Sequence, residues 1–381
     1  MCQAAKVLRE AASTDAASSV PRPSTRTRRA PRVSDAADRL VLLGTAGGSN
    51  PKSTRSGFSN AVVVGGAAYL LDCGEGVHTQ AWRAGVGMHQ LRRPPGGGAV
   101  VEAVFLSHLH SDHVIDYVNL FFGLWPTHTV HVYGPGPAGL PIATYPPGRE
   151  QEMRFPEDPT PGVRSMTDHL FRAFAYNLNV RMADEGRHDV TACVDVHEIG
   201  VRRPGYVPDI DLAVTASGAT VETAAPSMEP VEIHPLDANG VRVTAVLVQH
   251  APVFPALAYR FDTPTGSVVF SGDTGPCDNV VRLARGADVL VHEAIDVDFV
   301  AGRVAKMPNR DAIISHLASS HTSPEAAGTI ARRAGVKTLV LSHLVPGDDE
   351  ISEDEWEARA RAGFDGEIVC GVDLDQFALA R

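Results

Sequence analysis

Residues 104–113 of this chain read VFLSHLHSDH, an apolar run that ends abruptly in metal-ligand side chains. The apolar part, residues 104–106, is typical of a buried strand. The polar groups that follow would be costly to bury without partners. On an extended segment His108 and His110 point the same way, so both can reach one metal ion. Asp112 and His113 follow where the chain turns into a predicted helix, near a second ion.

Other apolar runs end in the same manner. They lead into His250, Asp273, Glu293 and His343. In open sheets with helical layers, binding sites form just beyond the ends of buried strands. Strand ends that meet at one rim would gather these side chains into one cluster, which a random group of solvated histidines would not explain. Strands dominate both halves of the chain and helices lie between them, so the sequence predicts an α/β fold.

Charge and composition exclude several classes of protein. The 381 residues carry a net charge of -11, of which residues 1–34 hold +5 and the remainder -16. An acidic body repels a polyphosphate backbone, which argues against nucleic acid as a partner. No apolar run approaches the ~20 residues that span a membrane. The five cysteines form no C-x-x-C pair and favour a reducing, cytoplasmic location.

The segment at about 142–235 differs from the rest. It is rich in Pro and Gly at both ends, and a helix is predicted in the middle, over 165–184. Phe171 and Phe174 follow each other at helical spacing, with Tyr176 close by. We interpret the segment as an inserted cap whose aromatic side chains wall a substrate pocket; packing of this stripe against the main body is the alternative. Residues 1–37 are predicted to be a disordered basic leader, and residues 38–381 the functional domain.

The His-x-His-x-Asp-His string resembles the metallo-β-lactamase superfamily. Motifs at 44–48 (GTAGG), 71–75 (LDCGE), 271–274 (SGDT) and 321–323 (HTS) resemble its ribonuclease Z-like branch, in family order. The resemblance implies an αββα sandwich, here with the inserted cap.

The resemblance also implies two zinc ions. His108, His110 and His250 would hold the first ion. Asp112, His113 and His343 would hold the second, with Asp273 as the bridge. Imidazole and carboxylate suit Zn²⁺, and this ligand type also accepts Mn²⁺ or Fe²⁺. A hydroxide shared by the two ions would be the nucleophile.

Three further residues receive roles from the same motifs. His321 is expected to act as general acid, with Glu293 as the carboxylate that orients it. Asp72 is expected to accept the outer N–H of a ligand histidine. The alternatives are a helix-terminal histidine, a structural ion pair and a turn aspartate, respectively. His316 is taken as a bystander.

The resemblance is weaker for the substrate. Ribonuclease Z enzymes that process transfer RNA carry an RNA-gripping arm before the bridging aspartate, and here only residues 261–272 separate Arg260 from Asp273. We therefore expect a hydrolase of a small anionic or aromatic ester, with a phosphodiester as the best guess. Lactones, aryl sulfates and carboxylic esters are alternatives, as is a ribonuclease Z-type RNA endonuclease. A non-enzymatic binding protein would have lost ligands, and none is missing. Enzymes of this branch are often dimers, so a homodimer is allowed.

Overall fold

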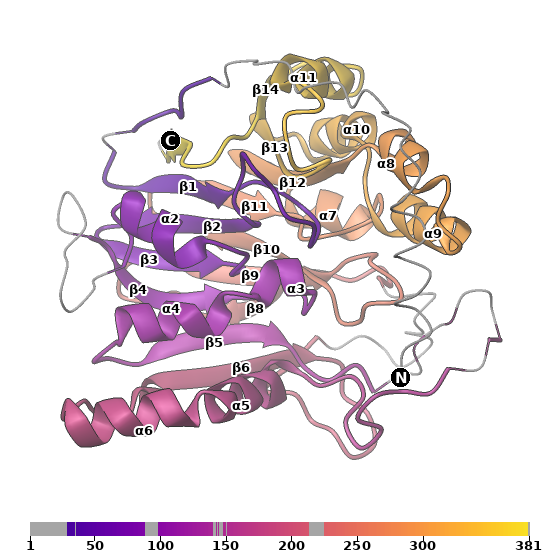
Figure 1. Cartoon of the computed structure of the whole chain (residues 1–381). Coiled ribbons are helices and arrows are strands. Elements are labelled where there is room, and N and C mark those ends of the chain that lie inside the picture. The colour runs from indigo at the N-terminus through magenta and orange to yellow at the C-terminus, as the bar shows by residue number, and fades with distance from the viewer. Residues whose placement is uncertain are drawn as a thin grey trace, which may run out of the picture.

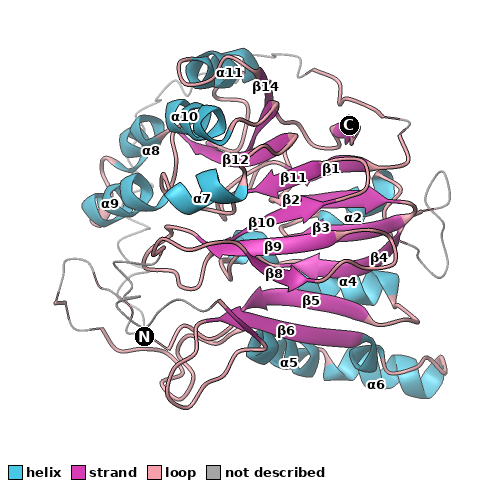
Figure 2. Ribbon diagram, turned by 180° about the vertical axis from the view of Figure 1, so that it is seen from behind, coloured by secondary structure: helices cyan, strands magenta, loops and turns pink. Residues whose placement is uncertain are grey.

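The computed structural model describes residues 29–34, 36–87, 98–139, 142, 144, 148–149, 151–212 and 225–379. Two sheets pack face to face, with helices on the outer side of each (Figures 1 and 2). In spatial order, the first sheet contains β15 (Gln376–Ala378), β1 (Arg39–Gly44), β2 (Ser59–Val64), β3 (Ala67–Leu71), β4 (Val100–Phe105), β5 (Val130–Pro135), β6 (Val194–Gly200) and β7 (Ile210–Asp211). The second sheet contains β14 (Glu367–Cys370), β13 (Thr338–Val345), β12 (Val289–Ile295), β11 (Ser267–Phe270), β10 (Leu257–Asp262), β9 (Arg242–Leu247) and β8 (Val231–His234).

The helices form the two outer layers. The first sheet is covered by α2 (Val77–Arg83), α4 (Tyr117–Leu124), α5 (Val163–Ala173) and α6 (Ala175–Asp184), and α3 (Ser111–Val114) lies at its rim. The second sheet is covered by α7 (Asp278–Leu283), α10 (Pro324–Ala334) and α11 (Glu353–Arg361), with α8 (Val297–Val304) and α9 (Arg310–Ser320) beside them. A short 3₁₀ turn, η1 (Val190–Cys193), precedes β6. The expected αββα sandwich is confirmed.

Both faces of the central strands are buried. On β1, Leu40 and Leu42 enter the core between the sheets, while Val41 and Leu43 pack under the helices. A strand covered on both faces reads as a continuous apolar run instead of an alternating one. This arrangement explains why the strand signals in the sequence are uninterrupted and why their polar ends stand out.

Helix α10 follows its sequence signals closely. The Ser323 hydroxyl accepts a hydrogen bond from the Ala326 backbone N–H, and Pro324 occupies the first helical position. Gly335 ends the helix with a φ of 67°, a left-handed conformation that favours glycine. The helix therefore runs from Pro324 to Ala334, with Ser323 as its N-cap. Its fixed start also sets the position of His321 just before it.

The segment 142–235 is part of the sandwich rather than a separate cap. It supplies β6, β7 and β8, and the helix predicted over 165–184 is two helices, α5 and α6, that meet at Phe174. The pair lies on the outer face of the first sheet (Figure 2). The amphipathic stripe is satisfied there by the sheet and by α4, so α5 and α6 do not act as a lid over the strand ends.

The three aromatic residues proposed for a pocket are accordingly placed elsewhere. Phe171 is buried against Phe121 and Phe122. Phe174 contacts Phe122 and is 42% exposed, and Tyr176 is 85% exposed. The expected pocket role of Phe171, Phe174 and Tyr176 is therefore wrong, because helical spacing predicts a buried face without telling which layer covers it.

The boundary of the predicted leader also differs. Residues 1–28 lie outside the described residues, but residues 29–34 pack on the end of the chain. The Arg29 guanidinium donates to both carboxylate oxygens of Asp375 and to the Cys370 carbonyl. The Arg32 backbone N–H donates to Asp375, and Gln376 donates back to the Arg32 carbonyl. Residues 29–34 are thus held in place by hydrogen bonds to the buried carboxylate of Asp375.

Replacing Arg29 with alanine is expected to lower the free energy of unfolding by about 1–3 kcal/mol, because it removes charged hydrogen bonds to the fully buried Asp375. Urea unfolding measures the change. Arg32→Ala is the matched control, since its guanidinium pairs only loosely with the exposed Glu367, at 3.4 Å, and should contribute less than about 1 kcal/mol. Equal effects of the two substitutions would contradict the prediction.

Within the described part of the chain, no helix combines the length and the apolar character needed to cross a membrane.

Candidate metal centre

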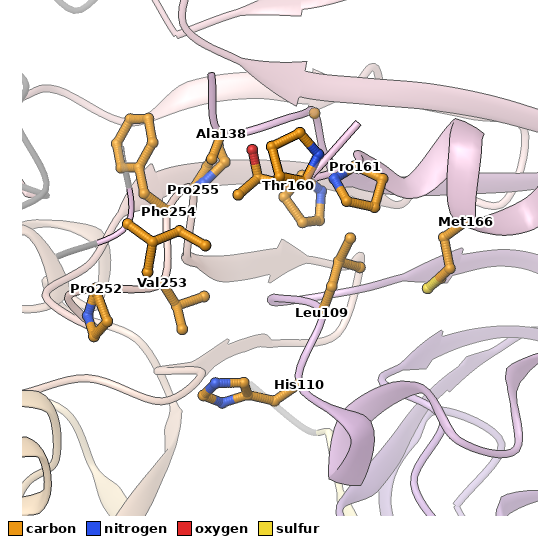
Figure 3. Close-up of a pocket in the computed structure, with 14 residues that line it drawn as sticks. Leu109, His110, Ala138, Thr160, Pro161, Met166, Pro252, Val253, Phe254 and Pro255 are labelled. Atoms are coloured by element: carbon orange, nitrogen blue, oxygen red, sulfur yellow. The ribbon is translucent and has the colours of Figure 1, made fainter. Parts of the chain in front are cut away.

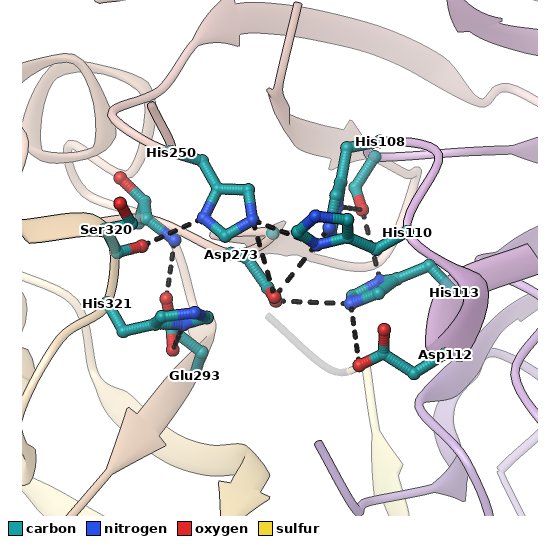
Figure 4. A network of polar contacts seen from close by, with 12 residues as sticks. His108, His110, Asp112, His113, His250, Asp273, Glu293, Ser320 and His321 are labelled. Carbon is teal, nitrogen blue, oxygen red and sulfur yellow. Dashed lines mark hydrogen bonds and ion pairs between the residues drawn. The ribbon is translucent and has the colours of Figure 1, made fainter. Parts of the chain in front are cut away.

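The predicted ligands lie close together: six of them are labelled in Figure 4, and His343 groups with Asp112 and His113. His108 and His110 follow β4, and Asp112 and His113 lie in the single turn of α3. The second sheet contributes the others: His250 lies after β9, Asp273 after β11 and His343 within β13. Strand order explains the convergence, because β9, β11, β12 and β13 run in the same direction and end at the same edge.

One group consists of His108, His110, His250 and Asp273. One potential ligand atom from each lies within 4.8 Å of all the others. His250 Nε2 is 3.3 Å from His110 Nδ1. Asp273 Oδ2 is 3.8 Å from His108 Nε2 and 4.0 Å from His250 Nε2. The four side chains surround one point.

A second group consists of Asp112, His113 and His343, with the other oxygen of Asp273. His113 Nε2 is 3.2 Å from His343 Nε2, which is 3.3 Å from Asp112 Oδ2. Asp273 Oδ1 is 3.3 Å from both imidazole nitrogens. Each oxygen of Asp273 therefore faces a different group, as a bridging carboxylate would.

The polar atoms of this cluster fit divalent metal ions. His108 Nε2 and Asp273 Oδ1 are buried and have no hydrogen-bond partner. A buried polar atom left unsatisfied typically costs about 1–3 kcal/mol, and each of these two atoms faces other ligand-type atoms of the cluster. Coordination would satisfy them. The imidazole and carboxylate donors suit Zn²⁺, Fe²⁺ or Mn²⁺.

Hydrogen bonds to the outer ring nitrogens hold the histidines in place. Asp72 Oδ2 is 2.9 Å from His113 Nδ1, and its two oxygens also accept from the Ser107 backbone and hydroxyl. The His250 Nδ1–H donates to the Ser320 carbonyl at 2.9 Å. With the outer nitrogen protonated, the inner one keeps its lone pair for a metal. The structure therefore places Asp72 in the contact that the sequence suggested.

Left-handed backbone conformations occur at key positions of the rim. Asp72 has a φ of 57° and His343 a φ of 47°. Non-glycine residues in this region typically cost about 1–3 kcal/mol and persist where packing enforces them. Gly47 allows the packing at His343, since a Cβ there would lie 2.4 Å from His343 Nδ1. The glycine-rich motif at 44–48 thus makes room for a ligand.

His321 and Glu293 form a buried pair beside the first group. His321 Nδ1 is 2.8 Å from Glu293 Oε2, while Glu293 Oε1 accepts from the Thr274 backbone N–H. The His321 ring lies 5.0 Å from the His250 ring. Burial on its own lowers the pKa of His321, but the negative charge and hydrogen bond of Glu293 outweigh it and raise the pKa to about 9. The geometry suits a proton donor: Nδ1 of His321 is engaged by Glu293, and Nε2 does not contact that carboxylate.

His316 is a residue that the sequence reasoning missed. Its ring lies 5.6 Å from that of His321, 5.7 Å from His250 and 6.4 Å from His110. It projects from α9, whose apolar residues follow no clear helical pattern. The sequence therefore does not indicate which side of α9 faces the candidate metal centre. The five-residue spacing before His321 was the only available hint, so its interpretation as a bystander does not match its position.

We expect His316→Ala to raise KM about tenfold with little change in kcat, because a contact made equally to bound substrate and transition state changes KM alone. Metal content should stay as in the unmodified protein, which separates this effect from loss of a ligand. Steady-state kinetics with metal analysis measures both. An unchanged KM would contradict the expectation.

A cavity of about 550 Å³ opens beside His110 (Figure 3). Its walls come from loops at residues 135–138, 159–161 and 252–255, and from Leu109 and Met166. Apart from His110 and Thr160, the residues that line it are apolar or glycine. Part of the wall, Ile142, residues 159–161 and Met166, comes from the segment 142–235 that was expected to border a pocket, but none of the aromatic residues named for that role lines it.

Comparisons with known proteins show what this chain is similar to. Residues 210–344 match the family model of the beta-lactamase superfamily domain. The Ribonuclease Z of Mycobacterium bovis (strain BCG / Pasteur 1173P2) is 31% identical over 335 residues, covering 88% of this chain and 96% of that protein. The Ribonuclease Z of Mycobacterium tuberculosis (strain ATCC 25618 / H37Rv) is also 31% identical with the same coverage.

Solved structures share the fold. The short form of human tRNase Z superposes with a TM-score of 0.53 at 18% identity, covering 90% of this chain and all of that one. The metallo-beta-lactamase fold protein YhfI from Bacillus subtilis gives a TM-score of 0.51 at 18% identity, covering 89% of this chain and 98% of that one. At these identities the likeness concerns the fold alone.

Proposed function

Because this chain belongs to the metallo-β-lactamase superfamily, in its ribonuclease Z-like branch, we propose that it cleaves a phosphodiester bond of RNA. It is a metal-dependent hydrolase, and phosphodiesters are compatible with its site. The observation that carries the proposal is the bridged ligand cluster with the His321–Glu293 pair, within a chain that matches proteins named Ribonuclease Z over nearly their whole length. The small ester favoured from the sequence takes second place for this reason.

We assign the metals to the two groups of ligands and take zinc as the resident ion. Divalent ions there would supply an activated water and polarise the phosphoryl oxygen. The protein itself does the rest. Asp273 sets the spacing of the two groups, and Asp72 and the Ser320 carbonyl fix the orientation of His113 and His250.

His321 handles the proton. As the bond from phosphorus to the leaving oxygen breaks, the ring nitrogen that faces away from Glu293 donates its proton to that oxygen. Glu293 keeps the imidazolium in place through Nδ1 and stabilises its charge. Water supplies the new oxygen on phosphorus, so the products are a phosphomonoester and an alcohol.

The RNA substrate can be tested directly. The full chain is incubated with a precursor transfer RNA carrying a 3′ trailer and, separately, with bis(p-nitrophenyl) phosphate. We expect cleavage of both, and we expect removal of residues 1–28 to weaken only the RNA reaction, because these residues hold a net charge of +3 in an otherwise acidic chain. Cleavage of the small diester without any RNA cleavage would overturn the RNA proposal.

A second candidate is a small ester with an apolar group. Two observations favour it. Strands β10 and β11 are joined by a tight turn, with Asp262 paired to Ser267, so no arm is inserted there. The cavity beside His110 offers no charged side chain other than that histidine. A panel of an aryl phosphodiester, a lactone and an aryl sulfate tests it; turnover of the RNA alone would exclude this candidate.

The metal identity and the assembly are separate proposals. Elemental analysis of protein purified without added metal should give at least two zinc ions per chain, two of them held by these ligands; iron or manganese in their place would revise the assignment. A homodimer, suggested only by resemblance, would appear as twice the chain mass in light scattering.

A further inference from the structure

We propose a further metal site, formed by His131, Asp195 and His197, away from the rim described above. His131 lies on β5, and Asp195 and His197 lie on β6. One potential ligand atom from each residue lies within 4.8 Å of the other two. The sequence gave no reason to group them, because His131 and His197 are 66 residues apart in the chain.

The three ligand atoms form a nearly equilateral triangle. His131 Nδ1 is 3.1 Å from His197 Nε2 and 3.3 Å from Asp195 Oδ2. His197 Nε2 is 3.2 Å from the same oxygen. Ligands in a tetrahedral zinc site with bonds of 2.0–2.1 Å lie about 3.3 Å apart. The observed edges match that spacing on all three sides.

Hydrogen bonds alone do not account for this triangle. Each ring nitrogen carries at most one proton, and each hydrogen bond needs a proton along its own edge. If both nitrogens donate to Asp195, two N–H groups face each other at 3.1 Å. If one nitrogen donates to the other, the accepting nitrogen has no proton for Asp195, and its lone-pair side lies close to the negatively charged carboxylate oxygen. A cation at the centre is attractive to all three atoms at once.

The surrounding structure holds the ligands in this position. The parallel ladder places His131 directly opposite Asp195 and Tyr133 opposite His197, so the side chains share one face of the sheet. The His197 ring stacks on Tyr133 at 4.6 Å with an interplanar angle of 15°. Tyr133 is itself fixed by a hydrogen bond between its hydroxyl and His234 Nδ1 at 3.0 Å. Pre-positioned ligands lose little conformational entropy on binding.

The site differs from the catalytic rim in place and in exposure. His131 is level with Ala103 on β4, and His108 lies five residues further along, which corresponds to about 16 Å of extended chain. The side chains are partly exposed: 40% for His131, 51% for Asp195 and 28% for His197. Water can therefore fill the remaining positions. Two imidazoles and one carboxylate suit a borderline divalent ion such as Zn²⁺, Co²⁺ or Ni²⁺.

Metal stoichiometry tests the proposal without reference to catalysis. The full chain is freed of metal with a chelator and titrated with Zn²⁺, and bound metal per chain is measured at defined free zinc. Three proteins are compared: the unmodified chain, the double variant His131→Gln/His197→Gln, and His169→Gln. His169 is an exposed histidine on α5, so its loss is a control for nonspecific binding.

We expect the unmodified chain and His169→Gln to bind one more zinc ion than the double variant. Titration with Co²⁺ should show a visible absorption band that the double variant lacks. Asp195→Asn keeps both histidines and should weaken zinc binding at this site at least tenfold. It tests the site even if the double variant does not fold. Identical isotherms for the unmodified chain and the variants would overturn the site, whatever the fate of the proposed RNA cleavage.

Discussion

Asp273→Ala is expected to abolish hydrolysis, with a loss of roughly 10⁴-fold or more, and to release metal from both groups. The carboxylate is the one side chain with an oxygen in each group, 3.3 Å from His113 and His343 on one side and 3.8 Å from His108 on the other. Its removal takes a ligand from both ions together. It also removes half of the negative charge that Asp112 and Asp273 place against two dications.

The measurement pairs metal analysis with turnover of bis(p-nitrophenyl) phosphate. Asp273→Asn is an informative companion, because the amide keeps the size but loses the charge and should also release metal. Asp311→Ala, an exposed aspartate on α9, is the control for a simple loss of charge. Circular dichroism checks the fold. An Asp273→Ala protein that keeps both its metal and its turnover would show that this carboxylate is not the bridge.

The candidate metal ligands could be grouped from the sequence because their signal is local. Each follows an apolar run, and the five runs become strands of one sandwich whose ends meet. Side chains alternate between the two faces of a strand, so the position of a residue just after a strand end indicates which way its side chain points. Sequence spacing was therefore enough to bring His108, His250 and Asp273 together before any contact was known.

The remaining errors concern packing between elements. The stripe that begins at Phe171 indicated a buried face but not the partner, which is α4 and the first sheet instead of the rim. His316 comes from a helix with almost no amphipathic pattern. Arg29 lies in a segment of low complexity and is held by Asp375, at the other end of the chain. Partners so distant in sequence leave no periodicity to read.

Net charge alone is a weak argument about the substrate. The -16 of residues 35–381 is a sum over that whole part of the chain, whereas binding depends on the local potential at the site and on the part of the chain that contacts the ligand. The basic N-terminal residues are a local exception to the overall sign, and divalent ions bound at the candidate metal centre would be another. For this reason the extensive match to proteins named Ribonuclease Z outweighs the acidic average.

His321→Ala is expected to lower kcat on RNA by about 10²–10⁴-fold while the metal content stays unchanged. His321 has no place in either ligand group needed to hold the two ions, and its hydrogen bond is to Glu293 at 2.8 Å. A general acid matters most where the leaving oxygen is strongly basic. The same substitution should therefore slow bis(p-nitrophenyl) phosphate much less, since p-nitrophenolate leaves without a proton.

Glu293→Gln distinguishes the role of Glu293 in orienting His321 from the role of His321 as proton donor. The amide cannot stabilise an imidazolium, but it fills the same space, so we expect a smaller loss of about 10–100-fold, again greater for RNA than for the aryl diester. In the double variant His321→Ala/Glu293→Gln, the second change should add little, because Glu293 acts through His321. Additive losses would mean that Glu293 has a role of its own. Equal losses on both substrates would mean that His321 stabilises charge on the phosphoryl group instead of protonating the leaving oxygen.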